Sequence, residues 1–396
     1  MNEEKKTNTN NSTAPASLPS GEGRGGASII IAGGGTGGHI FPAIAIANAL
    51  KKINAENEIL FVGAKGKMEM EKVPQAGYKI AGIDIAGFNR SSLIKNIGLP
   101  VKLMKSFLQV RHIIQSFRPD AVVGVGGYSS FPVLRYAQAK GIPTFIHEAN
   151  SFAGKSNQLL SKKAVKVFVA IDGMEAFFPA DKIIISGNPV RKDIVQSPIS
   201  KSEALQQFGL SGDKQTVLVV GGSLGAKSIN EAIDKHLDVL LQNNLQLIWQ
   251  TGKPYAAKAK ERAEGKSGIW VNEFISGMEM AYAAADMVIS RAGAMSIAEL
   301  CVVKKPVLFV PYPFAAEDHQ TVNAMRLVNK NAALMVKDSE AIDKVVPMII
   351  ELSKNEAKQQ ELKNNIGQLA ITNADEIIAT EILKYIRTPK GGRNSK

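Results

Sequence analysis

A glycine-rich turn, GGGTGGH at residues 33–39, constrains the fold of this chain more than any other feature. It follows an apolar run typical of a buried strand, residues 28–32, and precedes a helical pattern that begins near Ile40. Glycines at such a turn leave backbone N–H groups bare, and the helix dipole aims them at an anion. His39 adds a group that can take up a proton near neutral pH. The turn therefore predicts either a phosphate-binding loop or part of a catalytic site.

Short apolar runs alternate with helical patterns along the rest of the chain, which predicts right-handed βαβ units and parallel sheets covered on both faces. The expected strands are residues 29–32, 59–62, 80–83, 121–125, 144–146, 165–169 and 183–185, and then 216–220, 245–249, 269–272, 287–289, 307–310 and 333–336. The pattern breaks between Asn188 and Thr216, where Pro189 and Pro198 interrupt it. We therefore predict an α/β protein with two Rossmann-like domains, whose parallel sheets face each other across a cleft.

The predicted organisation has four parts. These are a disordered polar leader over 1–26, a first domain over 27–190, a second domain over 191–370, and a helix over 371–396 that returns to the first domain and ends in a basic tail. With 396 residues, of which 45% are hydrophobic, the chain can bury two sizeable cores. Its one cysteine, Cys301, excludes a disulfide framework and fits a reducing compartment.

Two more glycine turns follow expected strands, at residues 124–130 and 221–226, so that three such turns would line one cleft. The first turn also satisfies the G-x-G-x-x-G pattern of dinucleotide-binding proteins. That class requires a carboxylate after the second strand to hold a ribose hydroxyl, and the run FVGAKG at residues 61–66 has none. Lys65 or Lys67 could bind a dinucleotide only through a 2′-phosphate on its ribose. The sequence therefore disfavours a dehydrogenase.

The net charge is +12, and one stretch between Asp84 and Asp120 contains six basic residues and no acidic one. Its basic residues alternate with apolar ones, and the two sets are Arg90, Lys95, Lys102, Lys105, Arg111 and Arg118, and Leu93, Ile94, Ile97, Leu99, Leu103, Met104 and Phe107. This mixture suits an anionic membrane surface. The alternative is a core-packed helix over residues 101–117 with a solvated cationic side. Nucleic acid is not an expected partner, because the stretch contains no recognised binding motif.

The run GGGTGGHIFP at residues 33–42 resembles the amino-terminal motif of the MurG family of UDP-N-acetylglucosamine transferases. Further matches follow in the family's order: GVGGY at 124–128, HEAN at 147–150, GNPVR at 187–191, GGSLGA at 221–226, FI at 274–275, SRAGA at 290–294, AE at 298–299 and DHQ at 318–320. The resemblance covers residues 28 to 385. The sequence departs from the family at Ala149, where glutamine is common, and at residues 66–69, where GKME replaces a more basic or polar run.

The resemblance implies the GT-B fold, with the sugar donor held mainly by the second domain. It also implies transfer of N-acetylglucosamine from UDP-N-acetylglucosamine to the 4-hydroxyl of the muramoyl sugar of undecaprenyl-linked lipid I, which inverts the anomeric centre and forms lipid II for peptidoglycan. A peripheral enzyme on the cytoplasmic face of the inner membrane, near other cell-wall synthesis proteins, follows from that acceptor. The acid-free stretch then becomes the expected membrane-facing patch.

On the acceptor side, His39 is the candidate general base or a ligand of the acceptor's diphosphate. Thr36, Gly37 and Gly38 are expected to bind substrate beside it. Glu148 is the second catalytic candidate, since it and His147 follow a strand and can position the acceptor or orient His39. The last polar residue of the HEAN run, Asn150, is expected to contact the donor sugar or to face the cleft.

On the donor side, Arg191 is expected to pair with a phosphate of UDP, or else to form a salt bridge in the domain linker. Ser223 would offer donors at a helix start. The resemblance implies further contacts: the Ile275 backbone for uracil, Glu299 for the ribose hydroxyls, Gln320 and Asn323 for the sugar, and Ala294, Met295 and Ser296 as substrate-binding residues.

No cofactor or metal site is expected, because the sequence has no Asp-x-Asp motif, no cysteine pair and no H-x-x-x-H helix. A divalent cation would assist only by binding the diphosphate. Three rival hypotheses remain: another UDP-sugar transferase of the same fold, a UDP-sugar epimerase, or a non-catalytic nucleotide-sugar sensor.

Overall fold

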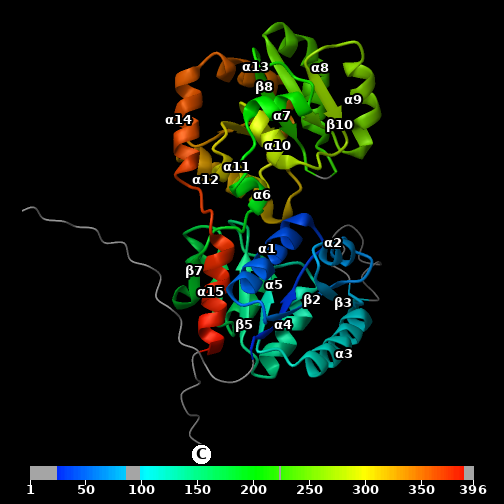
Figure 1. Ribbon diagram of the computed structural model, residues 1–396, viewed down its shortest axis with the longest axis vertical. Coiled ribbons are helices and arrows are strands. Elements are labelled where there is room, and N and C mark those ends of the chain that lie inside the picture. The colour runs from blue at the N-terminus through cyan, green and yellow to red at the C-terminus, as the bar shows by residue number, and fades with distance from the viewer. Residues whose placement is uncertain (1–24, 86–98, 223, 388–396) are drawn as a thin grey trace, which may run out of the picture.

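The computed structural model describes residues 25–85, 99–222 and 224–387. Its two lobes each contain a parallel sheet and lie one above the other in Figure 1. The strand order is β3-β2-β1-β4-β5-β6-β7 in the first sheet and β10-β9-β8-β11-β12-β13 in the second. In both sheets the chain starts in the middle and reverses direction after the third strand, which creates a crevice beside the first strand. The predicted parallel α/β fold with two Rossmann-like domains is confirmed.

The first lobe covers both faces of its sheet with helices. Its strands are β1 Ser28–Ala32, β2 Glu58–Ala64, β3 Lys79–Ile83, β4 Ala121–Gly124, β5 Thr144–Glu148, β6 Lys166–Val169 and β7 Ile183–Ile185. Its helices are α1 Gly37–Ile53, α2 Glu69–Gln75, α3 Leu99–Phe117, α4 Ser130–Ala139, α5 Lys155–Ser161, η2 Met174–Ala176, η3 Ala180–Lys182 and α15 Ala374–Arg387. Ile29 and Ile31 of β1 pack toward α1 and α15, whereas Ile30 packs toward α3 and α4. Burial on both faces explains why this strand is apolar at successive positions.

The second lobe repeats this plan. Its strands are β8 Gln215–Val220, β9 Leu245–Gln250, β10 Ile269–Asn272, β11 Met287–Ser290, β12 Val307–Phe309 and β13 Leu334–Met335. Its helices are α6 Lys192–Val195, α7 Lys201–Gln207, α8 Lys227–Gln242, η4 Lys253–Tyr255, α9 Ala256–Ala263, α10 Met278–Ala284, α11 Ala294–Val303, η5 Ala316–Asp318, α12 His319–Val328, η6 Asp338–Glu340, α13 Ala341–Ser353 and α14 Glu356–Gly367. Each strand predicted from the sequence coincides with an observed strand to within two residues at either end.

The chain passes between the lobes twice. Residues 186–191 lead from β7 to α6, and residues 368–373 lead from α14 back to α15. In Figure 1 the last helix, α15, lies beside α1 and β7 in the first lobe. Its apolar residues Ile378 and Ile382 join the core under α1, and Lys52 pairs with Glu376 at 2.7 Å. The second crossing therefore ties the end of the described chain to the helix that carries the first glycine turn.

Parts of three predictions lie outside the described residues: the leader over residues 1–24, the acid-free stretch over residues 86–98 and the basic tail over residues 388–396. Within the described parts of the chain, no helix is both long and apolar enough to cross a membrane.

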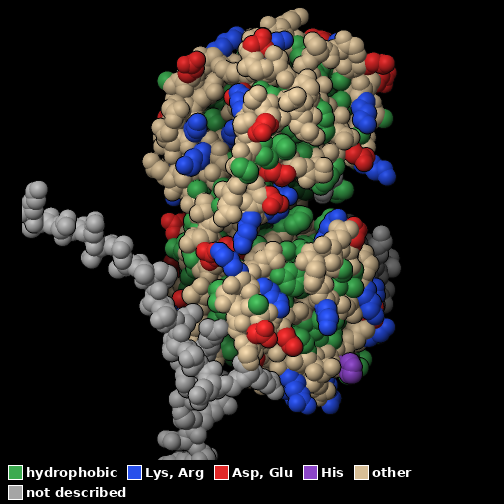
Figure 2. All heavy atoms as spheres, viewed as in Figure 1, with side chains coloured by type: hydrophobic (Ala, Val, Ile, Leu, Met, Phe, Trp, Pro, Cys, Tyr) green, Lys and Arg blue, Asp and Glu red, His purple; other side chains and the backbone are tan. Residues whose placement is uncertain are grey.

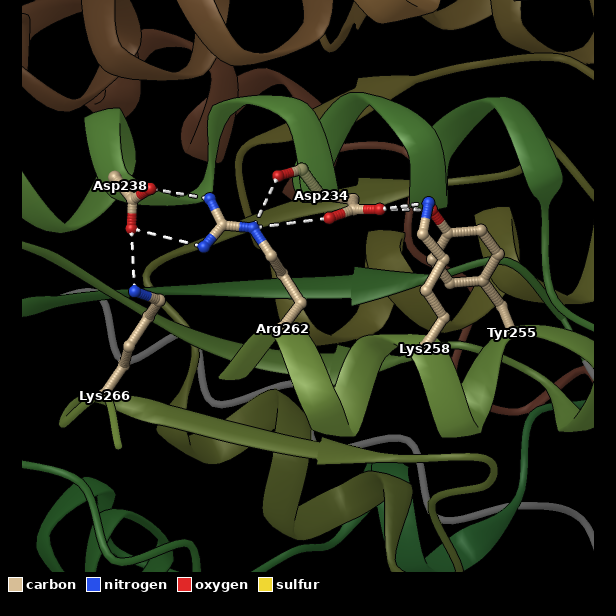
Figure 3. A network of polar contacts seen from close by, with 6 residues as sticks. All are labelled: Asp234, Asp238, Tyr255, Lys258, Arg262 and Lys266. Carbon is tan, nitrogen blue, oxygen red and sulfur yellow. Dashed lines mark hydrogen bonds and ion pairs between the residues drawn. The ribbon is translucent and has the colours of Figure 1, made fainter. Parts of the chain in front are cut away.

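A network of charged side chains joins α9 to α8 on the surface of the second lobe (Figure 3). Asp234 accepts a hydrogen bond from the Tyr255 hydroxyl at 2.6 Å and pairs with Lys258 at 2.7 Å and with Arg262 at 3.4 Å. Asp238 extends the network through Arg262 at 2.7 Å. Since Asp234 is only 13% exposed, its pairs are screened less than ordinary surface pairs.

We expect Asp234→Asn to lower the free energy of unfolding of the second lobe by about 1 kcal/mol, because one carboxylate serves three donors. Urea unfolding followed by tryptophan fluorescence measures this, since both tryptophans, Trp249 and Trp270, lie in the second lobe. The control is Asp343→Asn, which removes the exposed pair with Lys235. Equal midpoints for the two variants would contradict the expectation.

Candidate active site

The glycine turns at residues 33–39 and 124–130 interlock at the carboxyl ends of β1 and β4, which are neighbours in the sheet. The Gly34 N–H donates to the Gly126 carbonyl at 3.3 Å. A Cβ added to Gly127 would lie 2.4 Å from the Gly34 carbonyl oxygen, and its φ of +81° is in the left-handed region. Only glycine permits so close an approach of two backbones. The two turns therefore form one rigid unit.

His39 lies in the first turn of α1 with its ring against this unit. Its Nδ1 is 3.1 Å from the Gly34 carbonyl and 3.3 Å from the Thr36 hydroxyl. Because a carbonyl accepts only, we assign the proton to Nδ1, which leaves the lone pair on Nε2. A Cβ on Gly126 would lie 2.8 Å from Nε2, so the glycine makes room for that edge of the ring. The geometry presents Nε2 as a base.

Electrostatics keep His39 neutral. Burial lowers its pKa below 6.5, and the charge of His319 from α12 lowers it further, whereas Glu148, the Gly34 carbonyl and Glu69 oppose the shift. His147 is fully buried, and burial together with the charge of His39 lowers its pKa to about 4. Both imidazoles are therefore uncharged at neutral pH.

Glu148 is buried at the end of β5, and its carboxylate is held by the loop that follows. It accepts hydrogen bonds from the Asn157 amide at 2.8 Å and from the backbone N–H groups of Asn150 and Gly154 at 3.1 and 3.2 Å. The Asn150 amide lies 3.4 Å from the same carboxylate. Glu148 thus acts on His39 through its charge, which favours an imidazolium during catalysis. Its catalytic role stays a prediction.

Glu69, at the start of α2, is a site residue that the sequence analysis missed. It is 1% exposed, and its carboxylate accepts hydrogen bonds from the Gly35 N–H at 2.8 Å and the Ala64 N–H at 2.9 Å. The sequence lacks a carboxylate directly after the second strand, and Glu69, five residues beyond the end of β2, supplies one. The sequence signal that could have identified Glu69 is an acidic residue at the start of a helix just after that strand.

The expectation that the first glycine turn exposes bare N–H groups needs correction. The N–H groups of Gly33, Gly34 and Gly35 are already bonded to the Val62 carbonyl, the Gly126 carbonyl and the Glu69 carboxylate. An anion can approach only the first turn of α1, where helix geometry leaves the N–H groups of Gly37 and Gly38 without an intrahelical acceptor. Thr36 is exposed beside them.

Arg191 and Glu299, both predicted to bind the donor, are paired with each other. The Arg191 guanidinium lies 3.4 Å from the Glu299 carboxylate, which also accepts a hydrogen bond from the Tyr282 hydroxyl at 2.9 Å. Burial raises the pKa of Glu299, and Arg191 opposes that shift. Arg191 also packs over the Phe41 ring of α1, 5.5 Å from its centroid, and its buried Nε has no partner among the described residues. This cluster joins the two lobes.

Phe41 and Arg191 line a pocket between α1 and α6. The surface is notched between the two lobes on the right of Figure 2.

The two residues predicted to bind the sugar, Gln320 and Asn323, lie on α12. Gln320 accepts a hydrogen bond from the Tyr312 N–H at 3.0 Å. Asn323 is buried, and its amide spans the lobes, because it accepts from the Ser151 N–H at 3.0 Å and donates to the Ala292 carbonyl at 3.2 Å. Asn323 therefore lies where the lobes meet, and Gln320 precedes it by three residues on α12.

The remaining predicted donor residues lie on the second lobe. Ala294, Met295 and Ser296 form the first turn of α11, whose N–H groups are free of intrahelical partners. Ile275 follows β10 and is buried, which leaves its backbone as the group able to bind a base. Ser223 lies outside the described residues. Among the described residues, no group of three or more His, Cys, Asp or Glu side chains could hold a metal ion.

Comparison with known proteins assigns the class. Residues 29–169 match the glycosyltransferase family 28 N-terminal domain, and residues 216–379 match the glycosyltransferase family 28 C-terminal domain. The crystal structure of Acinetobacter baumannii MurG superposes with a TM-score of 0.73 at 30% identity and covers 90% of this chain and 99% of its own. A Staphylococcus aureus MnaA–UDP structure has a TM-score of 0.66 at 16% identity, which shows the fold alone. Fold and site define a GT-B glycosyltransferase.

Two relatives narrow the assignment. A Phocaeicola vulgatus protein is 52% identical over 90% of this chain and 96% of its own length, and a Flavobacterium psychrophilum protein is 49% identical over 91% and 98%. Both are named UDP-N-acetylglucosamine–N-acetylmuramyl-(pentapeptide) pyrophosphoryl-undecaprenol N-acetylglucosamine transferase. The chain belongs to this family, the MurG family, and it is a hexosyltransferase.

We expect His39 to titrate below 6.5 and His147 near pH 4, because burial disfavours both imidazolium ions. A carbon-13 NMR titration of histidine-labelled protein measures both, with resonances assigned from the variants His39→Gln and His147→Gln. A midpoint for His39 at or above 6.5 would show that its burial does not control its charge.

Proposed function

We propose that this chain carries out the reaction for which its relatives are named, transfer of N-acetylglucosamine from UDP-N-acetylglucosamine to the 4-hydroxyl of the muramoyl sugar of lipid I, giving lipid II for peptidoglycan. The observation that carries the proposal is the imidazole of His39, whose Nδ1 is fixed on the Gly34 carbonyl and whose pKa is lowered by burial, on the helix whose Phe41 packs against Arg191. An inverting transfer needs a base behind the attacking hydroxyl and support for the departing diphosphate, but no covalent nucleophile.

On the acceptor side, His39 Nε2 takes the proton of the attacking hydroxyl. The hydroxyl oxygen forms a bond to the anomeric carbon while the bond from that carbon to the diphosphate breaks, and its electron pair leaves with UDP. The α-linked donor thereby becomes a β-linkage. The charge of Glu148 stabilises the imidazolium that results. The N–H groups of Gly37 and Gly38, with Thr36, receive the acceptor's diphosphate.

On the donor side, the second lobe holds UDP-N-acetylglucosamine. The Ile275 backbone binds uracil, and Glu299 binds the ribose hydroxyls as a carboxylate acceptor. The first turn of α11 and Arg191 meet the diphosphate. Because Arg191 and Glu299 are 3.4 Å apart, a loose contact, donor binding can exchange this pair for substrate contacts. Gln320 and Asn323 contact the sugar.

No resident cofactor enters this mechanism. Arg191 and the helix N-terminus provide positive charge for the leaving diphosphate. A divalent cation would act by binding the diphosphate itself.

The proposed location is peripheral, on the cytoplasmic face of the membrane, and the described part of α3 supports the contact with lipid. Val101, Met104 and Leu108 are 64%, 66% and 64% exposed and lie on one side of the helix. Lys102 and Arg111 are exposed beside them. An exposed apolar stripe flanked by basic residues suits an interface with anionic lipid, where the lipid-linked acceptor resides. Other cell-wall synthesis proteins would meet the enzyme at the same membrane.

This stripe shares only Met104 with the apolar residues that the sequence analysis named in the acid-free stretch. Of the others named there, Leu103 and Phe107 are partly buried. A helix turns 100° per residue, so the exposed set follows the spacing i, i+3, i+7 from Val101.

We expect His39→Ala to lower kcat for UDP release about 10²- to 10⁴-fold with a soluble lipid I analogue as acceptor, because the base is lost. His112→Ala, at an exposed position on α3, is the matched control. UDP release by the unmodified protein that does not depend on the acceptor would contradict the proposed transfer and would favour an epimerase or a hydrolase. No turnover at all would favour a sensor. Full activity of His39→Ala would contradict only the base assignment.

We expect a variant with Val101, Met104 and Leu108 all replaced by serine to partition about 100-fold more weakly into anionic phospholipid vesicles, because each replacement removes about 1 kcal/mol of apolar transfer energy. Vesicle co-sedimentation measures the partitioning, and Val239→Ser on α8 of the other lobe is the control. Unchanged partitioning would place the membrane contact elsewhere.

A further inference from the structure

We propose that Glu69 is a positioning residue for the transfer, because its carboxylate occupies the anion position of the first glycine turn and thereby fixes the loop on which His39 rests. The inference rests on the proposed function, since it assigns Glu69 a role in the proton transfer by His39.

The carboxylate bridges two segments that are distant in sequence. Its two oxygens accept from the Gly35 N–H at 2.8 Å and from the Ala64 N–H at 2.9 Å, which join the turn after β1 to the end of β2. Charge-assisted hydrogen bonds of this length, shielded from water at 1% exposure, are strong. The adjacent Gly34 carbonyl receives His39 Nδ1. The Gly35 N–H that Glu69 accepts from and the Gly34 carbonyl that orients the base thus belong to the same planar peptide group.

The glycines around Glu69 are shaped to its side chain. A Cβ on Gly34 would lie 2.3 Å from the Glu69 carboxyl carbon, and one on Gly63 would lie 2.5 Å from its Cγ. Gly34 also has a φ of +147°. A side chain at either glycine would collide with Glu69, so the observed position of the carboxylate requires glycine at both residues.

The second lobe offers an internal comparison. Its glycine turn follows β8, the counterpart of β1, and the neighbouring strand β9 ends in Gln250. The Gln250 amide accepts from the Gly221 N–H at 3.1 Å and donates to the Gly222 carbonyl at 2.9 Å. A neutral amide therefore braces the turn assigned to the donor, and a carboxylate braces the turn beside the base. The negative charge of Glu69 also repels a phosphate from Gly33–Gly35.

The charged and titratable groups that act on His39 come from three elements. Glu148 and His147 lie on β5, Glu69 on α2 and His319 on α12. Of these, Glu69 and Glu148 favour the imidazolium. Removing the charge of Glu69 therefore lowers the pKa of His39, and the acidic limb of the rate profile moves to lower pH.

The test uses the full chain, UDP-N-acetylglucosamine and a soluble lipid I analogue. Glu69→Gln removes the charge, and Glu69→Asp keeps the charge but shortens the reach to the two N–H groups. Glu71→Gln, an exposed position on the same helix, is the matched control. We expect both Glu69 variants to lose about 10²-fold in kcat, because small displacements of a catalytic group have effects of that size. We expect only Glu69→Gln to shift the acidic limb downward in pH.

A measurement of UDP binding distinguishes a local effect on the base from a general loss of structure. UDP binding measured by calorimetry reports the second lobe and should be unchanged in both variants, and circular dichroism reports folding. If Glu69→Gln does not fold, the rate loss of Glu69→Asp with an unmoved acidic limb decides the question. Rates equal to those of Glu71→Gln would overturn the proposal. Acceptor-independent UDP release by the unmodified protein would instead refute the proposed function.

Discussion

The close contact between the glycine turns after β1 and β4 is the constraint on which the acceptor side depends. Parallel pairing places both turns at the same edge of the sheet, and the Gly34 N–H to Gly126 carbonyl bond joins them. A side chain at Gly127 would collide with the Gly34 carbonyl. That carbonyl in turn orients His39, whose ring edge uses the space left by the glycine at position 126. The tautomer of the base is therefore a consequence of backbone packing.

The contacts that hold the lobes together involve groups that the proposed mechanism assigns to the donor. Arg191 pairs with Glu299 and packs on Phe41, and Asn323 bonds to the Ser151 N–H across the junction. Buried polar groups require partners, and these groups find them in one another. Under the proposed mechanism, donor binding exchanges these hydrogen bonds for contacts with the substrate, which would couple occupancy of the donor site to the contacts between the lobes.

The fold was predictable because its determinants are local. Continuous β-branched runs such as Ile29–Ile31 and the glycines that follow them specify a strand buried on both faces and a tight turn. The location of His39 followed from the same turn. The position of Glu69 after β2 was a signal in the sequence, but its partners were not predictable, because its carboxylate reaches a loop 34 residues away and only packing of the two segments sets its direction. The pairing of Asn323 and the exposed side of α3 likewise depend on tertiary contacts. The donor-site roles rest on resemblance, since a buried helix acid such as Glu299 carries no distinguishing local pattern.

The two lobes repeat one topology but differ in the group that braces the first glycine turn. In the first lobe the brace is the anion of Glu69, and in the second it is the neutral amide of Gln250. A turn that already holds a carboxylate has little affinity for phosphate and raises the proton affinity of the imidazole beside it. A turn with a neutral brace keeps the positive potential of its helix N-terminus for a diphosphate. Under the proposed function, this difference in charge fits the different tasks of the two lobes, proton transfer in the first and nucleotide binding in the second.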